Sequence, residues 1–461
     1  MADEIFRQSV KIERPAGEVF AWHERPGALE RLCPPWEKIQ IIERLGGIRD
    51  GARVVLRSKV GPFWSTWRVE HADYVAGRHF RDVLRSGPFA KWEHLHEVKP
   101  LSATACELVD TITYRLPGGA LGEMVAGSFT RDKLRQMFTW RQATTKCDVE
   151  LANHYGVVAP RRILVSGASG MIGRVLVAFL RTQGHDVVTL VRGRAAGAGE
   201  ITWNPARSEL DATQLEGIDA VIHLSGENVG AGRWTAARRE AIMRSRVDAT
   251  RTLVVALTKL KRKPRVLVSA SAVGFYGDCG AEEVTEAHGI GHGFLPEVCL
   301  AWETHAEGAA RLGVRTAVMR LGVVLSPAGG ALAKMLPAFQ ACAGGPMGTG
   351  RQYLSWAAVD DVVGALYHAV LDERCAGPIN VVAPESVTNA QFAATLGRVL
   401  HRPAILPVPA AMLRLIFGQM AEETILGSTR AVPQRLTEWG YSFRQPTLAG
   451  ALRFVLGRER A

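Results

Sequence analysis

Three glycines at intervals of three residues carry the clearest chemical signal in the sequence. They lie in the segment Gly167-Ala168-Ser169-Gly170-Met171-Ile172-Gly173, between an apolar run at 162–166 and a helical pattern at 171–182. Gly167 permits a tight turn, Gly170 lets backbone N–H groups approach a pyrophosphate, and Gly173 lets the helix pack against the strand. The partial positive charge of a helix N-terminus favours bound phosphate. We predict that the segment binds a dinucleotide through Gly167, Ser169, Gly170, Met171, Ile172 and Gly173.

Two arginines follow the next strand-like run, at 186–191, and bear on the choice of dinucleotide. The sequence there reads Thr189-Leu190-Val191-Arg192-Gly193-Arg194. A site selective for NAD usually places an acid at this point to hold the ribose hydroxyls, whereas an arginine binds a 2′-phosphate in a bidentate way. We predict NADP(H) as the cofactor, bound by Arg192 and Arg194. The alternative is that both are solvated loop charges.

Other side chains that could do chemistry give weaker signals. His94 and His96 point to one face of a predicted strand, but no third metal ligand is visible at a suitable spacing. We interpret them as surface histidines and predict no metal. The seven cysteines are scattered and never form Cys-x-x-Cys, which indicates reduced thiols.

Composition limits the classes of partner. The chain has 461 residues and a formal charge of +11, yet its 56 basic residues are interspersed with 45 acidic ones. The longest basic run is Lys261-Arg262-Lys263, so we expect no nucleic-acid partner. No apolar run reaches the ~20 residues of a membrane span, and the acidic start Met1-Ala2-Asp3-Glu4 lacks the features of a signal peptide. We expect a cytoplasmic protein whose oligomeric state carries no sequence signal.

The pattern of elements changes near residue 155. Before it, alternating stretches at 52–60 and 106–114 predict antiparallel strands, and a helix is predicted over 128–151 with Ser128 as N-cap. Large rings at 63–69 and 91–97 suit either a core or a ligand cavity, and we interpret them as core. A linker is expected at 153–160. Beyond it, strand-like runs at 162–166, 186–191, 220–224, 266–269 and 316–320 alternate with helical stretches, which predicts a doubly wound parallel sheet.

Several later segments, taken with the glycine turn, resemble the extended short-chain dehydrogenase/reductase superfamily and its epimerase-family branch. They are Asp219 to Gly226, Val268-Ser269-Ala270-Ser271-Ala272-Val273-Gly274-Phe275-Tyr276-Gly277-Asp278, Met319 to Leu325 and Gly440-Tyr441-Ser442-Phe443. The resemblance covers about residues 161–455 and implies an NADP-binding Rossmann domain with a helical substrate-side segment from about 405. Residues 1–155 resemble the START-like helix-grip fold of the polyketide cyclase superfamily, which implies an α+β domain for an apolar ligand.

The resemblance also implies residue roles. Leu224, Ser225 and Gly226 would contact the adenine-side ribose, while Ser269, Arg320 and Leu321 would line the nicotinamide side. Ser271 matches the catalytic serine, and Tyr276 is a candidate substitute acid.

The usual catalytic pair Tyr-x-x-x-Lys is replaced here by Cys299-Leu300-Ala301-Trp302-Glu303. A carboxylate beside a thiol raises the pKa of the thiol, so the usual proton relay is lost, and Glu303 could instead bond the cofactor ribose. Two functions stay open. One is an NADP(H)-dependent oxidoreductase or epimerase-like enzyme acting on a small molecule with Ser271, Tyr276, Cys299 or Glu303. The other is a non-catalytic NADP(H)-dependent sensor or scaffold that carries an apolar ligand.

Overall fold

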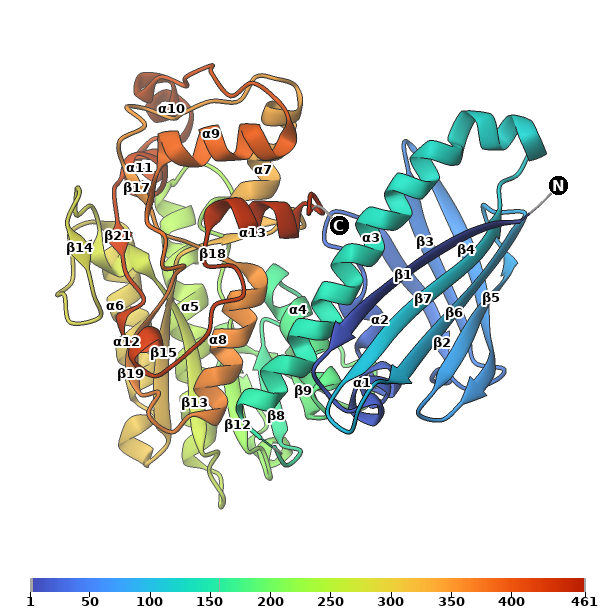
Figure 1. The fold of residues 1–461 in the computed structure, drawn as a ribbon. Helices are drawn as coiled ribbons and strands as arrows, with labels where there is room; N and C mark the ends of the chain where they lie inside the picture. The colour runs from blue at the N-terminus through green and yellow to red at the C-terminus, as the bar shows by residue number, and fades with distance from the viewer. Residues whose placement is uncertain (1–2, 157, 460–461) are drawn as a thin grey trace. The chain divides into compact units, whose positions relative to one another are not determined.

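The protein is described by a computed structural model that covers residues 3–156 and 158–459, with the side chains of residues 152 and 153 excepted. Its contacts divide the chain into two units (Figure 1). The first contains the residues up to Ala159, together with Ala178–Gly184 and the residues from Leu456 on; the second contains Pro160–Val177 and His185–Val455. The predicted linker at 153–160 includes residue 157, which lies outside the described residues. Within the described part of the chain, every helix is too short or too polar to cross a bilayer.

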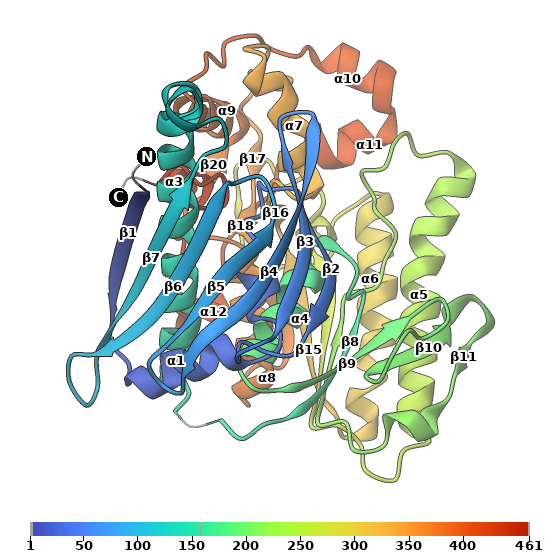
Figure 2. The same ribbon diagram turned by 90° about the vertical axis from the view of Figure 1, so that its right-hand side faces the viewer.

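The first unit is built on an antiparallel sheet of seven strands in the order β1-β7-β6-β5-β4-β3-β2, seen face-on in Figure 2. The strands are β1 (Glu4–Ile12), β2 (Ile39–Leu45), β3 (Arg53–Val60), β4 (Phe63–Val75), β5 (His79–Ser86), β6 (Lys91–Pro100) and β7 (Cys106–Arg115). Alternate residues of β6 are buried, as expected for a sheet with one covered face. The helices are α1 (Ala16–Glu24), α2 (Ala28–Arg31) and the long α3 (Gly119–His154).

The core of the first unit lies between this sheet and its helices. Trp92, Ile112 and Tyr114 pack with Leu134 and Phe138 of α3. This is the predicted helix-grip arrangement, and the predicted fold class is confirmed. The interpretation of all the rings as core was wrong at the start of β4, where the side chains of Phe63 and Trp64 are exposed.

The long helix begins nine residues before the predicted N-cap, Ser128. Gly118 and Gly119 have positive φ angles and turn the chain into α3 after Pro117. The first turns carry Leu121, Met124 and Val125 with exposed side chains, so they lack the periodic burial on which the sequence prediction relied.

The second unit holds the predicted doubly wound sheet. Its strand order is β11-β10-β9-β8-β12-β13-β15-β19, and all the pairs except β10 with β11 are parallel. The strands are β8 (Arg162–Ser166), β9 (Asp186–Val191), β10 (Glu200–Asn204), β11 (Glu209–Leu210), β12 (Ala220–His223), β13 (Val266–Ala272), β15 (Arg315–Leu321) and β19 (Gly377–Val381). The chain order reverses between β8 and β12, and at such a switch point an open parallel sheet binds ligands outside the carboxyl ends of its strands.

Helices flank this sheet. They are α4 (Met171–Thr182), α5 (Ala236–Thr258), α6 (Phe294–Glu307) and α8 (Val359–Leu371), while a further helix, α7 (Gly330–Gln340), contacts the short strand β16 (Val323–Leu325). On one face, Leu164, Val221 and Leu267 of the sheet pack with Leu253 of α5 in a fully buried cluster. Burial on both faces explains why these strands appear in the sequence as continuous apolar runs.

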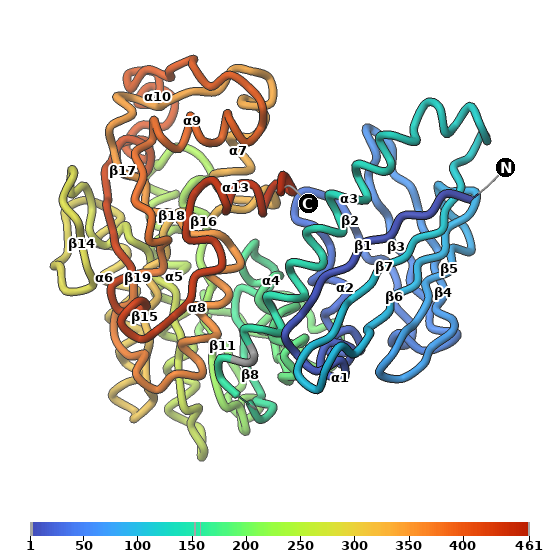
Figure 3. The backbone as a smooth tube through the Cα atoms, in the orientation of Figure 1, coloured from blue at the N-terminus to red at the C-terminus, as the bar shows by residue number. Residues whose placement is uncertain are grey.

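The C-terminal segment, traced in orange to red in Figure 3, adds short helices, and three small strand pairs lie outside the two main sheets. The helices are α9 (Asn389–Leu400), α10 (Ala410–Phe417), α11 (Gln419–Ala421), α12 (Gln434–Glu438) and α13 (Leu448–Val455). The pairs are β14 (Glu283–Val284) with β21 (Arg430–Ala431), β16 (Val323–Leu325) with β18 (Trp356–Ala358), and β17 (Tyr353–Leu354) with β20 (Val387–Thr388).

Candidate functional site

The glycine turn follows β8 and packs against the end of β12. Gly167 has a φ of +74°, and a Cβ there would lie 2.8 Å from the carbonyl carbon of Leu224 and 3.0 Å from the backbone nitrogen of Ser225. Only glycine permits so close an approach. The turn and the residues after β12 therefore meet at the switch point, as the predicted roles of Leu224, Ser225 and the exposed Gly226 require.

The other two glycines of the turn differ in what surrounds them. A Cβ on Gly173 would lie 2.2 Å from the carbonyl oxygen of Gly167, so this position holds the turn together. A Cβ on Gly170 would meet only that same oxygen, at 3.2 Å, and Gly170 is exposed with Ser169. Gly170 therefore borders open space at the N-terminus of α4, where a phosphate group would fit. Met171 and Ile172, half-buried, form the first turn of the helix.

A buried histidine beneath the turn was missed in the sequence. His223 ends β12; its Nδ1 lies 2.6 Å from Ser166 Oγ and its Nε2 lies 3.0 Å from Thr250 Oγ1. Because the Thr250 hydroxyl donates to the Arg246 carbonyl, it accepts from Nε2–H, which leaves Nδ1 to accept from Ser166. Burial lowers the pKa of His223 to about 4, so the ring is neutral and ties β8 to β12. A histidine at the end of an apolar strand was the only sequence signal.

The two arginines after β9 are free to meet a phosphate. Both are exposed, and the side chain of Arg192 retains 80% of its accessible surface. Arg192 Nη1 lies 3.8 Å from Glu227 Oε1, while Arg238 Nη1 donates to the other oxygen of Glu227 at 3.2 Å. Arg238 thus offsets the charge of Glu227, and Arg192 together with Arg238 leaves an excess of positive charge beside the residues that follow β12.

The candidate catalytic residues form one buried network at the carboxyl ends of β13 and β15. The carboxylate of Glu303, on α6, accepts from Arg320 Nε at 3.0 Å and from Arg320 Nη2 at 2.8 Å. The Ser271 hydroxyl donates to the same carboxylate at 2.6 Å. Glu303 was a candidate for the cofactor ribose and Arg320 for the nicotinamide side. The structure gives each of them protein partners.

Tyr276 extends this network. Its hydroxyl accepts from Arg320 Nη1 at 3.0 Å and donates to Asn380 Oδ1 at 2.7 Å. Burial raises the pKa of Tyr276, although Arg320 opposes the shift, so the phenol stays protonated at neutral pH. Asn380 was not predicted. It lies at the same edge of the sheet, on β19, and is fully buried.

Cys299, which the resemblance places at the position of the family tyrosine, is not poised as a nucleophile. Its thiol is buried and donates to the Ala272 carbonyl over 3.7 Å. Burial, together with the charge of Glu303, raises the pKa of the thiol to about 11. Ser269, also predicted at the cofactor, is buried, whereas Leu321 is half-buried.

The interpretation of His94 and His96 as surface histidines was wrong. On β6 they share the buried face with Trp92 and Val98, and their exposed fractions are 2% and 8%. The period of two between Trp92 and Val98 was the signal that predicts this burial. A third ligand group, Asp82, lies across the sheet on β5, where sequence spacing did not reveal it.

Comparisons with known proteins match different families to different parts of the chain. The model of the NAD dependent epimerase/dehydratase family matches residues 163–382, and that of the polyketide cyclase / dehydrase and lipid transport family matches residues 12–139. A domain of unknown function, DUF1731, matches residues 408–455.

Three similar proteins match this chain over most of their own length. An epimerase family protein of Mycobacterium bovis, Mb2239, is 38% identical over 296 residues, which are 64% of this chain and 98% of that protein. The crystal structure of a nucleoside-diphosphate sugar epimerase from Corynebacterium glutamicum matches 99% of this chain and 91% of its own, at 31% identity and a TM-score of 0.81. The structure of the human epimerase family protein SDR39U1 (isoform 2) with NADPH matches 64% of this chain and 98% of its own, at 33% identity and a TM-score of 0.58.

Proposed function

This chain belongs to the NAD dependent epimerase/dehydratase family, and from that premise we propose that its second unit binds NADPH at the carboxyl ends of β8, β9 and β12. The observation that carries the proposal is the open face of Gly170 at the start of α4, with two exposed arginines after the neighbouring strand. The human relative with NADPH supports the same cofactor.

The donor set fits this dinucleotide. The first backbone N–H groups of α4 suit the pyrophosphate, because the first turn of a helix has no intrahelical partner for them. The guanidinium groups of Arg192 and Arg194 suit the 2′-phosphate, which carries more negative charge than a ribose hydroxyl. Leu224, Ser225 and Gly226 border the same crevice and would face the adenosine half. When bound, NADPH supplies a hydride.

We infer that the chain acts as an oxidoreductase or an epimerase-like enzyme on a small molecule with a carbonyl or a hydroxyl group. In this proposal the protein binds the dinucleotide but does not use the Tyr-x-x-x-Lys proton relay. Cys299 and Glu303 stand at the positions that the resemblance assigns to that tyrosine and lysine. Ser271 and Tyr276 are the hydroxyl groups that we propose exchange a proton with the substrate. Both are hydrogen-bonded into the Glu303–Arg320 network, so a substrate would have to compete for them.

A second candidate function rests on that same network. Because the side chains in the catalytic positions are buried and bonded to one another, the chain could bind NADPH as a sensor or scaffold, with an apolar ligand in the first unit. Single-turnover oxidation of NADPH, followed by absorbance with a panel of aldehydes, ketones and nucleoside-diphosphate sugars, separates the two. Oxidation that Ser271→Ala slows supports the enzyme; no oxidation by any member of the panel, with NADPH still bound, supports the sensor.

A further inference from the structure

A cluster of histidines and aspartates lies on the inner face of the first unit's sheet. Cross-strand pairing builds it: Asp82 of β5 lies opposite His94 of β6, and His96 lies opposite Asp110 of β7. Gln142 of α3 donates to Asp110 Oδ2 at 2.7 Å, so this face is turned toward the long helix. All members of the cluster belong to one unit.

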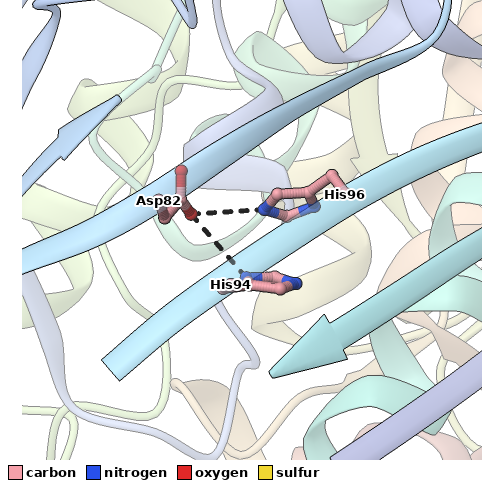
Figure 4. Close-up of side chains that lie close together, drawn as sticks. All are labelled: Asp82, His94 and His96. Carbon is pink, nitrogen blue, oxygen red and sulfur yellow. Dashed lines mark hydrogen bonds and ion pairs between the residues drawn. The ribbon is translucent and has the colours of Figure 1, made fainter. Parts of the chain in front are cut away.

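Three ligand atoms in this cluster converge. Asp82 Oδ2 lies 3.2 Å from His96 Nε2 and 3.7 Å from His94 Nδ1, as the dashed lines in Figure 4 mark. All three ligand atoms lie within 4.8 Å of one another. Metal–ligand bonds of ~2.0–2.1 Å place two ligands of a tetrahedral ion roughly 3.3 Å apart. The separation of 3.7 Å is too long for a hydrogen bond but suits two ligands of one ion.

On the side of each imidazole away from Asp82, the second ring nitrogen faces Asp110. His94 Nε2 lies 2.9 Å from Asp110 Oδ1, and His96 Nδ1 lies 3.2 Å from the same oxygen. Because a carboxylate only accepts, both of these ring nitrogens carry the proton. The nitrogen of His94 that faces Asp82 is then a lone pair, whereas His96 Nε2 forms a hydrogen bond to Asp82 Oδ2 and gives up its proton when it binds an ion. A bound ion would replace this proton and would also satisfy the lone pair of His94, which faces the same carboxylate oxygen at 3.7 Å.

The groups around these three side chains resemble the surroundings of metal ligands in known metalloproteins. A metal-bound histidine almost always donates its other N–H to a carboxylate or carbonyl, and here Asp110 receives both. The second oxygen of Asp82 lies 2.7 Å from His71 Nδ1, without the alignment of a hydrogen bond. The rings of Phe80 and Phe138 cover the imidazoles, at centroid distances of 4.2 Å from His96 and 5.0 Å from His94. The side chain of Asp82 is 22% exposed, which leaves a path for an ion.

We propose that Asp82, His94 and His96 bind a divalent transition-metal ion of the Zn²⁺ class, with Asp110 orienting both imidazoles. A 2+ ion balances the charges of the two carboxylates, which otherwise share the single positive charge of His96, because Asp82 and Asp110 raise the pKa of His96 to about 9 against the effect of burial. Two imidazoles and one carboxylate are ligands that such ions prefer, and three protein ligands keep a coordination position for water or a substrate oxygen.

The test uses the tag-free full chain after dialysis against EDTA, titrated with Co²⁺ as a coloured probe and then with Zn²⁺. We expect one Co²⁺ per chain with visible d–d absorption, which Zn²⁺ abolishes. Asp82→Asn and His96→Gln should weaken Co²⁺ binding by at least about 100-fold, and Asp110→Asn by about 10–100-fold. His79→Gln, on the same strand as Asp82 but outside the cluster, is the control and should bind as the wild type does.

Two results would overturn the proposal. One is a folded, EDTA-treated wild type that takes up neither Co²⁺ nor Zn²⁺; the other is Co²⁺ binding that Asp82→Asn and His96→Gln leave unchanged. Should these variants fail to fold, X-ray absorption of the Zn²⁺-loaded wild type decides the matter. Two imidazole ligands support the site, and a shell without imidazole contradicts it.

Discussion

At the scale of single residues, the buried pair of Glu303 and Arg320 dominates the candidate catalytic site. Their side chains are 8% and 4% exposed and are held by two parallel hydrogen bonds. Such a pair adds little net stability over apolar residues of the same size, but removal of one partner leaves a buried charge uncompensated. This cost explains why a lysine in place of Glu303, which would restore half of the usual relay, is incompatible with Arg320.

We predict that Glu303→Gln lowers the free energy of unfolding by about 3–5 kcal/mol, because Arg320 loses its counter-charge. Urea denaturation measures the change. Glu307→Gln, on the exposed face of the same helix, is the control and should change stability by less than about 0.5 kcal/mol. The double variant Glu303→Leu with Arg320→Met should recover most of the loss. A loss below about 1 kcal/mol for Glu303→Gln would contradict this account of the pair.

A second prediction concerns Arg192 and cofactor choice. Arg192→Ala should shrink the preference for NADPH over NADH by about 1.5–3 kcal/mol, roughly 10- to 150-fold, since a charged hydrogen bond to the 2′-phosphate is lost. Equilibrium titration with both nucleotides measures it. Arg311→Ala serves as the matched control, because Arg311 precedes β15 and so lies at the opposite edge of the sheet. An unchanged ratio of affinities would exclude Arg192 from the phosphate site.

A third prediction follows from the pKa of His223, which burial lowers from its ordinary value of 6.5 to about 4. Between these pH values the unfolded chain binds a proton that the folded chain does not, so stability falls as the pH falls through this window. The loss approaches about 3 kcal/mol at pH 4. His223→Asn should flatten this part of the pH profile of unfolding relative to the wild type. Parallel profiles would show that His223 is not buried as a neutral ring.

At the scale of elements, the boundaries that could be predicted are those set by local pattern. The strands β8 and β9 and the helix α4 begin and end where apolar runs and glycine stops predict. The start of α3 was missed because its first turns expose apolar side chains. The partners of Ser271, Glu303 and Arg320 could not be predicted, since β13, α6 and β15 are distant in sequence and only the fold brings them together.

The glycine turn yields a prediction at this scale. Gly170→Val should abolish dinucleotide binding and leave the fold intact, because its Cβ would meet only the carbonyl oxygen of Gly167, at 3.2 Å, and otherwise faces the open space that we assign to the phosphates. Gly173→Val should instead destabilise the turn itself, where a Cβ would lie 2.2 Å from a carbonyl oxygen. Calorimetry with NADPH and thermal unfolding separate the two effects. Gly289→Val, exposed and without neighbours within 4 Å, is the control. Normal NADPH affinity in Gly170→Val would place the phosphates elsewhere.

At the scale of the whole molecule, the chain joins two families. The family models confirm both resemblances drawn from the sequence, an epimerase-family Rossmann domain and a polyketide cyclase-like domain. The Mycobacterium bovis relative is matched over 98% of its length by 64% of this chain. The remaining third of this chain therefore has no counterpart in that relative. The Corynebacterium glutamicum protein matches 99% of this chain and therefore shares both units. The proposed NADPH site needs only the second unit, whereas the proposed metal site needs only the first.

The central claim is that the second unit binds NADPH in preference to NADH. The most direct measurement is calorimetric titration of the tag-free full chain with each nucleotide at the same salt concentration. We predict one NADPH bound per chain and an affinity for NADH that is at least about 10-fold weaker, because only NADPH carries the 2′-phosphate that Arg192 and Arg194 would meet. Equal affinity for the two nucleotides, or no binding of either, would contradict the claim.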